Sequence, residues 1–282
     1  MGILAADEAG LEEMACLLAR QDVAVARAIV VAGDWPTALQ ALQNEPAVEV
    51  VILAREGEAV PADPLLAQVK RSDKPTVVCL LGSEPRLAWR AGAIPAGRLD
   101  EAARRAAAWI RDWDQALISS QLQEEDDRLL ARARRLVPGV DLQLPNAAHV
   151  LAPTSLGYEA RLMIAETAGS DVAVTCSEPV RGSLTPIRKA AADLAAAAIL
   201  LTLRLEAEPV GGRVQALARH AGQARAGGTL VCVHLYGPKP QALAQGEAAM
   251  KKAGVIVAES NAAGARLVGL ALRQRAALRP LQ

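Results

Sequence analysis

Residues 228–260 read GTLVCVHLYGPKPQALAQGEAAMKKAGVIVAES. An apolar run, GTLVCVHLYG (228–237), is followed by a segment with helical spacing and then by a second apolar run, GVIVAES (254–260). A strand, a helix and a second strand in this order predict a βαβ unit, whose two strands lie parallel in one sheet. Apolar runs that are nearly continuous are typical of strands covered on both faces.

The same alternation extends outward from this stretch through the whole chain. Further strands are expected at RAIVVAG (27–33), VEVVILARE (48–56), PTVVCLLG (75–82), DVAVTC (171–176) and AAILLTLRLE (197–206). Helical spacing separates these runs. The helical segments of the second half are GYEARLMIAETA, LTPIRKAAADLA, VQALARHAGQAR, LAQGEAAMKKA and AAGARLVGLALRQR.

The two halves of the chain resemble each other at an offset of about 150 residues. LEEMACLLAR (11–20) is echoed by YEARLMIAET (158–167), PTVVCLLG is echoed by GTLVCVHLYG, and Pro36 is echoed by Pro186. We therefore predict an α/β protein with two tandem flavodoxin-like parallel-sheet domains joined by a long helical connector. The domains are expected at residues 1–115 and 151–282, and the connector at residues 116–150.

Composition limits the functional classes that fit the chain. The 282 residues carry 31 basic and 31 acidic side chains, so no global positive field favours nucleic acid. No apolar run approaches the length of a membrane span, and MGILAADEAG lacks the basic start of a signal peptide. A cytoplasmic protein without a membrane or nucleic-acid partner is expected. The 60 alanines and the absence of Phe predict a core built from many close contacts between small side chains.

The segment at residues 98–139, which overlaps the predicted connector, has strong helical propensity and ends at Pro138-Gly139, which is a helix stop signal. Its side chains allow two interpretations. It can be a solvated helix with internal ion pairs, or a helix that docks a partner through the apolar surface of Trp109 and Trp113.

Cysteine and histidine spacing does not favour a metal site. No C-x-x-C pair occurs, and Cys79 and Cys232 lie inside apolar runs, where a thiol acts as a small hydrophobe. His234 alternates with apolar neighbours in a predicted strand and is expected to be structural. Neither G-x-G-x-x-G nor G-x-x-x-x-G-K-[ST] occurs, so classical dinucleotide and P-loop sites are not expected.

Ligands of open α/β sheets bind beyond the carboxyl ends of the strands. Ser83 follows one predicted strand, Gly237 and Lys239 follow another, and Ser260 and Asn261 follow the last one. Ser260 or Asn261 is expected to cap the following helix. This helix start is either an ordinary capped terminus or a site where free N–H groups bind an anion.

Several of these segments resemble a known family. GILAADEAGLEEMACLLAR, VEVVILARE and KPTVVCLLG resemble the first CoA-ligase domain of FdrA-type proteins, which are similar to succinyl-CoA and acyl-CoA synthetases. PIRKAAADLAAAAILLTLRLE, YGPKPQ and AGVIVAESNAAGARL (253–267) resemble the C-terminal domain of the same family. The resemblance runs in the right order over nearly the whole chain and implies that both domains are of the CoA-ligase type.

The chain also departs from the family pattern, as a shortened and divergent member would. The glycine-rich loop is replaced by Gly33-Asp34-Trp35-Pro36, and in WRAGAI (89–94) Arg90 stands where ligase relatives carry a phosphorylated histidine. Phosphohistidine chemistry is therefore not expected. YGPKPQ keeps Gly237, Pro240 and Gln241 of a longer family segment, and TLRLEAEPVGG lacks the family's aspartate.

The resemblance implies a subunit of a hetero-oligomeric carbamoyltransferase, similar to the oxamate carbamoyltransferase of purine-nitrogen catabolism. The alternatives are an acyl-CoA synthetase subunit and a non-catalytic scaffold subunit. Carbamoyl phosphate is the expected substrate, no cofactor is evident, CoA and nucleotides are not expected, and other subunits are the expected partners. No catalytic residue is identified. The expected anion-binding residues are Ser260, Asn261, Gly237, Lys239, Arg90 and Ser83.

Overall fold

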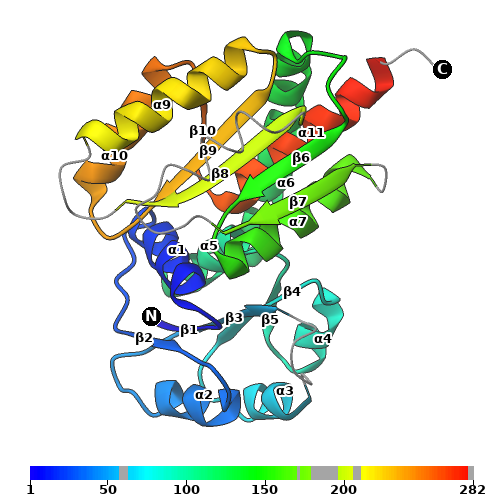
Figure 1. Cartoon of the computed structure of the whole chain (residues 1–282). Coiled ribbons are helices and arrows are strands. Elements are labelled where there is room, and N and C mark those ends of the chain that lie inside the picture. The colour runs from blue at the N-terminus through cyan, green and yellow to red at the C-terminus, as the bar shows by residue number, and fades with distance from the viewer. Residues whose placement is uncertain (57–62, 170–171, 179–195, 206–210, 279–282) are drawn as a thin grey trace. The chain divides into compact units, whose positions relative to one another are not determined.

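Each half of the chain folds around its own five-stranded parallel sheet (Figure 1). The computed structural model describes residues 1–56, 63–169, 172–178, 196–205 and 211–278. The two sheets have strand orders β2-β1-β3-β4-β5 and β10-β9-β8-β6-β7. When the strands of each sheet are numbered along the chain, both orders are 2-1-3-4-5, which is the flavodoxin-like order. The predicted tandem α/β fold is thus confirmed.

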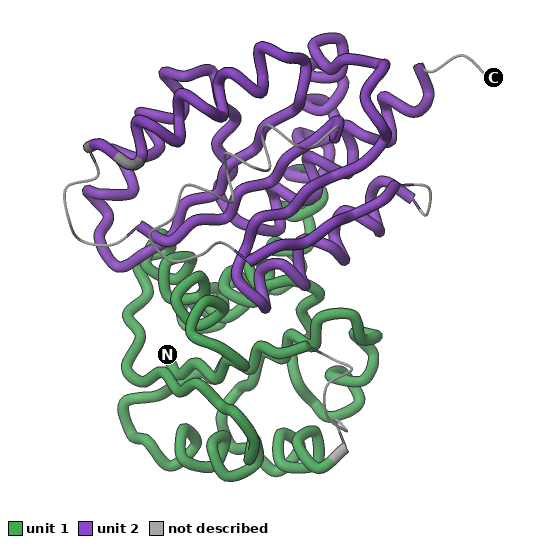
Figure 2. The backbone as a smooth tube through the Cα atoms, in the orientation of Figure 1, with its two compact units in different colours: residues 1–124 green, residues 125–282 purple. Residues whose placement is uncertain are grey.

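Two compact units divide the chain at residues 124 and 125, within helix α6 (Figure 2). The first unit contains α1 and α5 on one face of its sheet and α2, α3 and α4 on the other (Figure 1). Its elements are β1 (Gly2–Ala5), α1 (Glu8–Ala19), β2 (Arg27–Val30), α2 (Trp35–Gln43), β3 (Val51–Glu56), α3 (Asp63–Lys70), β4 (Thr76–Leu81), α4 (Pro85–Arg90), β5 (Ile94–Ala96) and α5 (Leu99–Ile110).

The second unit repeats this arrangement, with α7 and α11 on one face of the sheet and α9 and α10 on the other. The helix predicted at LTPIRKAAADLA and the echo at Pro186 lie outside the described residues. The remaining elements are α6 (Gln115–Leu136), a 3₁₀ turn (Val137–Gly139), β6 (Ala147–Leu151), α7 (Thr154–Ala168), β7 (Ala173–Ser177), β8 (Ala198–Arg204), α9 (Gly211–Ala226), β9 (Leu230–Tyr236), α10 (Pro240–Lys252), β10 (Ile256–Ala258) and α11 (Asn261–Leu278).

Local sequence accounts for the starts of α1 and α2 in the first unit. The Asp7 carboxylate accepts a hydrogen bond from the Gly10 N–H at 2.8 Å, and Asp34 accepts one from the Thr37 N–H at 3.1 Å. Each aspartate therefore caps a helix by accepting from an N–H that has no partner inside the helix. Pro36 follows at the start of α2, where its missing N–H has no consequence.

Small residues bring helices close to each other and to the sheets, as the alanine content predicts. Five alanines of α5 are buried, and α11 buries alanine and glycine along most of its length. A Cβ built on Gly269 would lie 3.0 Å from the Ile164 carbonyl oxygen of α7 and would collide with the Thr167 side chain. Glycine at this position therefore permits the close approach of α11 and α7.

The connector differs from one continuous helix. The chain breaks between α5 and α6, where Asp112 adopts a left-handed φ of 53° and Asp114 accepts a hydrogen bond from the Ala116 N–H. Helix α5 belongs to the first unit, since it packs on α1 and β4. One interpretation of the sequence expected the ion pairs of this helix to be internal. In the structure, Asp126 of α6 forms an ion pair with Arg266 of α11. None of the described helices is both long and apolar enough to cross a membrane.

Three strands of the structure were not predicted from the sequence. They are β1, β5 and β6, which contain four, three and five residues. Proline interrupts β5, and β6 reads AAHVL, which mixes alanine and histidine with only two large apolar residues. Four of the five residues of β6 lie within residues 116–150, which the sequence assigns to the connector, and the fifth is Leu151. Short strands with these residues give a weak β signal, although β1 and β6 lie inside their sheets.

Candidate functional site

The strand order places a ligand crevice at a defined point in each sheet. Chain connections diverge from the first and third strands of a 2-1-3-4-5 sheet, and ligands bind beyond the carboxyl ends of these two strands. In the first unit these strands are β1 and β3, and in the second unit they are β6 and β8. Each unit therefore has its own candidate edge.

In the second unit, Ser260 caps α11. Its hydroxyl oxygen accepts a hydrogen bond from the Ala263 N–H at 3.0 Å, and its carbonyl oxygen accepts one from the Gly264 N–H. The prediction that Ser260 or Asn261 caps this helix is confirmed for Ser260. Ser260 is 97% buried and its hydroxyl oxygen is hydrogen-bonded to the helix, so the side chain stabilises the start of α11.

Asn261 lies at the first position of α11 and is fully buried. Its amide nitrogen donates to the Leu156 carbonyl oxygen at 2.8 Å and to the Glu159 carboxylate at 2.7 Å, and its amide oxygen accepts from the Thr202 hydroxyl at 2.7 Å. The side chain thus joins α11 to α7 and β8. These bonds use both N–H groups of the amide, so Asn261 stabilises the edge from inside.

Gly237 and Lys239 follow β9 at the same edge. Gly237 has a φ of 146°, and a Cβ at this position would collide with the Leu205 carbonyl oxygen. Glycine is therefore required because two backbone segments approach closely here. Lys239 is exposed and precedes α10, whose start has no side-chain cap.

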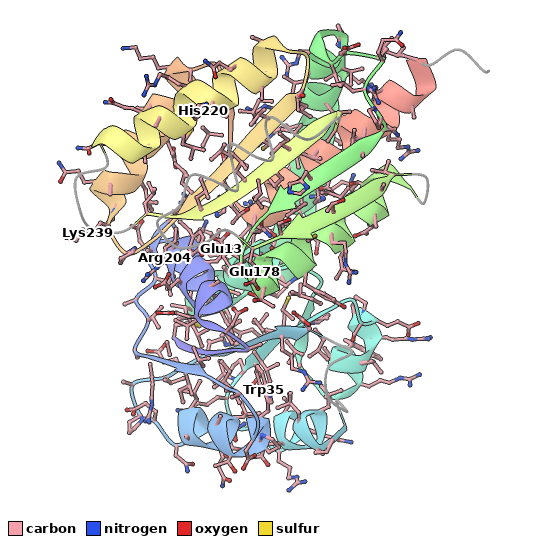
Figure 3. All side chains as sticks on the ribbon, in the orientation of Figure 1. Glu13, Trp35, Glu178, Arg204, His220 and Lys239 are labelled. Atoms are coloured by element: carbon pink, nitrogen blue, oxygen red, sulfur yellow. The ribbon has the colours of Figure 1, made fainter. Side chains whose placement is uncertain are left out.

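The start of α7 is the second helix terminus at this edge without a side-chain cap. Thr154, its first residue, donates its hydroxyl to the Glu178 carboxylate at 2.6 Å. Figure 3 shows Arg204 and Lys239 where β8 and β9 end, with Glu178 at the end of β7. Strands β6 and β9 are separated by β8, so their ends lie about 10 Å apart. The edge thus combines two helix N-termini and two cationic side chains with one carboxylate, Glu178, which already contacts the first residue of α7. The start of α10 beside Lys239 is therefore the part of the edge best suited to an anion.

The crevice edge of the first unit has a different character. The Asp7 side chain already caps α1, and Glu8 follows in its first turn. Arg55 near the end of β3 is 96% buried, with its guanidinium 5.6 Å from the Trp35 ring centre, and burial lowers the pKa of this group. Acidic side chains at the start of α1 oppose the binding of an anion at this helix terminus.

The two expected anion-binding residues of the first unit lie at opposite edges of its sheet. Ser83 is half-buried in the turn after β4, where its N–H donates to the Leu80 carbonyl oxygen. Arg90 ends α4 and is exposed, and it lies at the amino edge of the sheet beside Thr76 and Ile94. A ligand at the carboxyl edge would meet the Ser83 turn without reaching Arg90.

The buried cysteines and histidines belong to the cores. Cys79 and Cys232 are fully buried as predicted, and burial raises the pKa of the Cys232 thiol to about 12. His234 is buried, its Nδ1–H donates to the Ala258 carbonyl oxygen at 3.3 Å, and its ring stacks with that of Tyr236. Burial lowers the pKa of His149 in β6. Across the described residues, no three His, Cys, Asp or Glu side chains gather in a group that could hold a metal ion.

Two parts of this edge were not predicted from the sequence. Thr154 was missed because β6 was not recognised, so the loop between β6 and α7 was not assigned to a strand end. Arg204 was placed inside a longer strand. The repeat contains the missing signal, since the two matching helices at residues 11–20 and 158–167 each follow a short apolar run, GILA and HVLA.

The chain is a tandem α/β protein with two parallel sheets, and comparisons with known proteins do not assign it to a narrower class. No family model matches it, and no curated protein matches it. Solved structures that resemble it include PH0766 of Pyrococcus horikoshii, which is 11% identical, with 96% of this chain and 64% of that chain covered and a TM-score of 0.34. The chain spans about two thirds of the length of this protein.

Two further structures show similarly distant likeness. The dinucleotide-forming acetyl-coenzyme A synthetase 1 of Ca. Korarchaeum cryptofilum, in complex with phosphate and ADP, is 14% identical, with 98% of this chain and 64% of that chain covered and a TM-score of 0.40. Glucosamine-6-phosphate deaminase of Thermotoga maritima is 11% identical, with coverage of 98% and 84% and a TM-score of 0.42. At these identities and scores the likenesses assign no activity to the chain.

Proposed function

We propose that this chain is an FdrA-like subunit of a hetero-oligomeric carbamoyltransferase, whose second unit binds the phosphate group of carbamoyl phosphate. The observation that carries the proposal is the carboxyl edge of the second sheet. There α7 and α10 begin without side-chain caps, and Arg204 and Lys239 stand at the ends of β8 and β9. The sequence resemblance to FdrA-type proteins supplies the reaction class.

The chemistry of carbamoyl transfer fits such an edge. A nitrogen or oxygen of the acceptor attacks the carbamoyl carbon, and the bond between that carbon and the bridging oxygen breaks. Inorganic phosphate leaves with the electron pair and takes up the proton that the acceptor loses. Negative charge is therefore present on the phosphate in the ground state and grows at the bridging oxygen during the reaction. Helix N–H groups and a lysine ammonium stabilise charge of this kind without a covalent intermediate on the protein.

The roles of the expected residues differ within this proposal. Lys239 would contact the phosphate, because its exposed side chain extends from the edge. Ser260, Asn261 and Gly237 would act indirectly, because their hydrogen bonds and close backbone contacts hold α11, β8 and the β9 turn in place. They are positioning residues for the edge.

The first experiment measures binding of phosphonoacetamide, a stable analogue of carbamoyl phosphate, to the purified chain by isothermal titration calorimetry. The substitution K239A should weaken binding by about tenfold, since a hydrogen bond to a charged group is lost. The matched control is K252A, because Lys252 is an exposed lysine at the other end of the same helix. Equal affinity of K239A and the unchanged chain would contradict the proposed phosphate site.

The second experiment tests the assembly by native mass spectrometry of the tagged chain purified from its own cells. Co-purification of two other subunits in fixed stoichiometry would support the transferase proposal, and carbamoyl phosphate consumption by that complex would then be measured. Retention of CoA on the chain would instead favour the acyl-CoA synthetase alternative. An assembled complex whose turnover is unaffected by K239A would favour a scaffold subunit.

A further inference from the structure

A hollow of about 620 Å³ lies at the amino edge of the first sheet, within the first unit. Thr76 and Ile94, the first residues of β4 and β5, lie at its base, and the last turns of α3, α4 and α5 surround it. The volume falls in the range of roughly 300–1,000 Å³ that is usual for small-molecule sites. The hollow lies away from the carboxyl edges discussed above, and it is independent of the proposed function.

Two tryptophan side chains border this hollow. Trp89 of α4 is 71% exposed and Trp109 of α5 is 47% exposed, although the whole chain contains only four tryptophans and no phenylalanine. Neither indole ring makes a ring contact with a described residue. Exposed aromatic rings at a concave surface are typical of binding sites, because their faces bury a large area against a flat ligand.

Cationic side chains lie beside these rings. Lys70, Lys74 and Arg90 line the hollow with one acid, Asp73, so the positive side chains outnumber the negative ones by two. The Lys74 ammonium donates to the Glu45 carbonyl oxygen at 2.6 Å. Lys70 and Arg90 form neither a hydrogen bond nor an ion pair with any residue in the part of the chain that the structure describes. Both remain available for a ligand anion.

We propose that this hollow is a binding site for a planar aromatic ring that carries an anionic group. The ring stacks on the indole of Trp89 or Trp109, above an apolar surface that includes Val69 and Ala91. The anionic group, a phosphate, carboxylate or sulfonate, is bound by Arg90, whose planar guanidinium donates two parallel hydrogen bonds to such groups, and by Lys70. The indole rings provide the surface that the ligand buries, and the cationic side chains select for an anionic ligand.

The test uses 8-anilinonaphthalene-1-sulfonate, which is an aromatic anion, with energy transfer from tryptophan as the readout. N-phenyl-1-naphthylamine supplies a similar ring system without charge. The proposal predicts saturable binding of one sulfonate per chain and an affinity for the neutral compound at least about fivefold lower. Equal affinity for the charged and neutral compounds would overturn the proposal, as would the absence of saturable binding.

Three variants locate the site. R90Q should weaken sulfonate binding about fivefold, and W89L should reduce both affinity and energy transfer. Both side chains are exposed, so the fold should persist, which far-UV circular dichroism can check. R86Q is the matched control, because Arg86 is an exposed arginine on the same helix that does not line the hollow. Equal losses in R90Q and R86Q would overturn the proposal.

Competition then distinguishes the natural sources of such a ligand. Displacement of the dye by AMP would indicate a ring attached to a phosphate, and displacement by indole-3-acetate would indicate a ring attached to a carboxylate. Displacement by either compound, lost in R90Q, supports the site. Dye binding that neither compound displaces would overturn the proposal and leave the hollow as an apolar surface only.

Discussion

Asn261 shows how one buried amide connects three elements of the second unit. Its partners Leu156, Glu159 and Thr202 lie 105, 102 and 59 residues away in sequence. An amide with neutral donors and an acceptor matches a carboxylate, a carbonyl and a hydroxyl at the same time. The residue type therefore matters more here than its size.

The substitution N261A should destabilise the chain by about 3 kcal/mol, because the buried Glu159 carboxylate and the Thr202 hydroxyl both lose the amide that they contact. T202V, which removes only the hydroxyl, should cost about 1 kcal/mol and is the matched control. Urea unfolding followed by far-UV circular dichroism gives both values. A free energy of unfolding for N261A within about 0.5 kcal/mol of the unchanged chain would contradict this account.

We expect His149 to make the free energy of unfolding depend on pH near neutrality. It lies in β6 with 7% of its surface exposed, and burial lowers its pKa below the ordinary value of 6.5. As the pH falls below 6.5 the unfolded chain takes up a proton that the folded chain does not bind, so the folded state loses stability. The loss continues down to the folded pKa, and above about pH 7 the contribution is constant.

The measurement compares the free energy of unfolding of the unchanged chain and H149Q between pH 5 and pH 8. The difference between them should change by up to about 1.4 kcal/mol per pH unit below pH 6.5, always in the direction that destabilises the chain with histidine. Subtracting H149Q removes the contributions of groups common to both proteins. A difference that does not vary with pH would show that His149 does not titrate differently on folding.

At the scale of elements, the packing of α11 against α7 depends on Gly269. Alanine in a helix interior is normally more favourable than glycine by about 1 kcal/mol. At Gly269 the order should reverse, because a Cβ would lie 3.0 Å from the Ile164 carbonyl oxygen and would collide with Thr167. G269A should therefore destabilise the second unit by about 1–3 kcal/mol.

Gly212 in α9 provides the control for this prediction. Among the described residues, no atom beyond its chain neighbours and its own helix backbone lies within 4 Å of the position that its Cβ would occupy, so G212A should be neutral or slightly stabilising. Urea unfolding of both variants separates the two effects. Similar stabilities of G269A and G212A would show that α11 can move away from α7 at little cost.

The sequence predicted most elements, and the exceptions have a common physical basis. Long Val-, Ile- and Leu-rich runs, such as those that form β3, β4, β8 and β9, are covered by helices on both faces and are recognisable locally. The central strands β1 and β6 are short, and neighbouring strands on both sides stabilise them. Their stability comes from long-range pairing, which local sequence does not report.

The sequence likewise predicted part of the candidate site. Ser260 could be assigned as a cap because a serine before a helical segment is a local signal. The burial of Asn261 depends on partners far away in sequence, so local sequence did not reveal it. Arg90 was grouped with Ser83, but it is the last residue of α4, and this six-residue helix returns the chain to the other edge of the sheet.

At the scale of the whole molecule, the two units share one topology but differ in their aromatic residues. The sequence repeat matches equivalent elements, since α1 corresponds to α7 in the repeat and β4 corresponds to β9. All four tryptophans, Trp35, Trp89, Trp109 and Trp113, belong to the first unit, whereas Tyr158 and Tyr236 belong to the second. Tryptophan fluorescence therefore reports unfolding of the first unit alone.

This difference allows a test of whether the units unfold separately. Each unit has its own sheet and its own buried cluster, so each should unfold as a cooperative transition. G269A changes only the second unit. In urea it should add an earlier phase to the circular dichroism transition while leaving the tryptophan fluorescence midpoint unchanged. If both signals shift together, destabilising the second sheet also unfolds the first, and the two units form a single cooperative structure despite their separate cores.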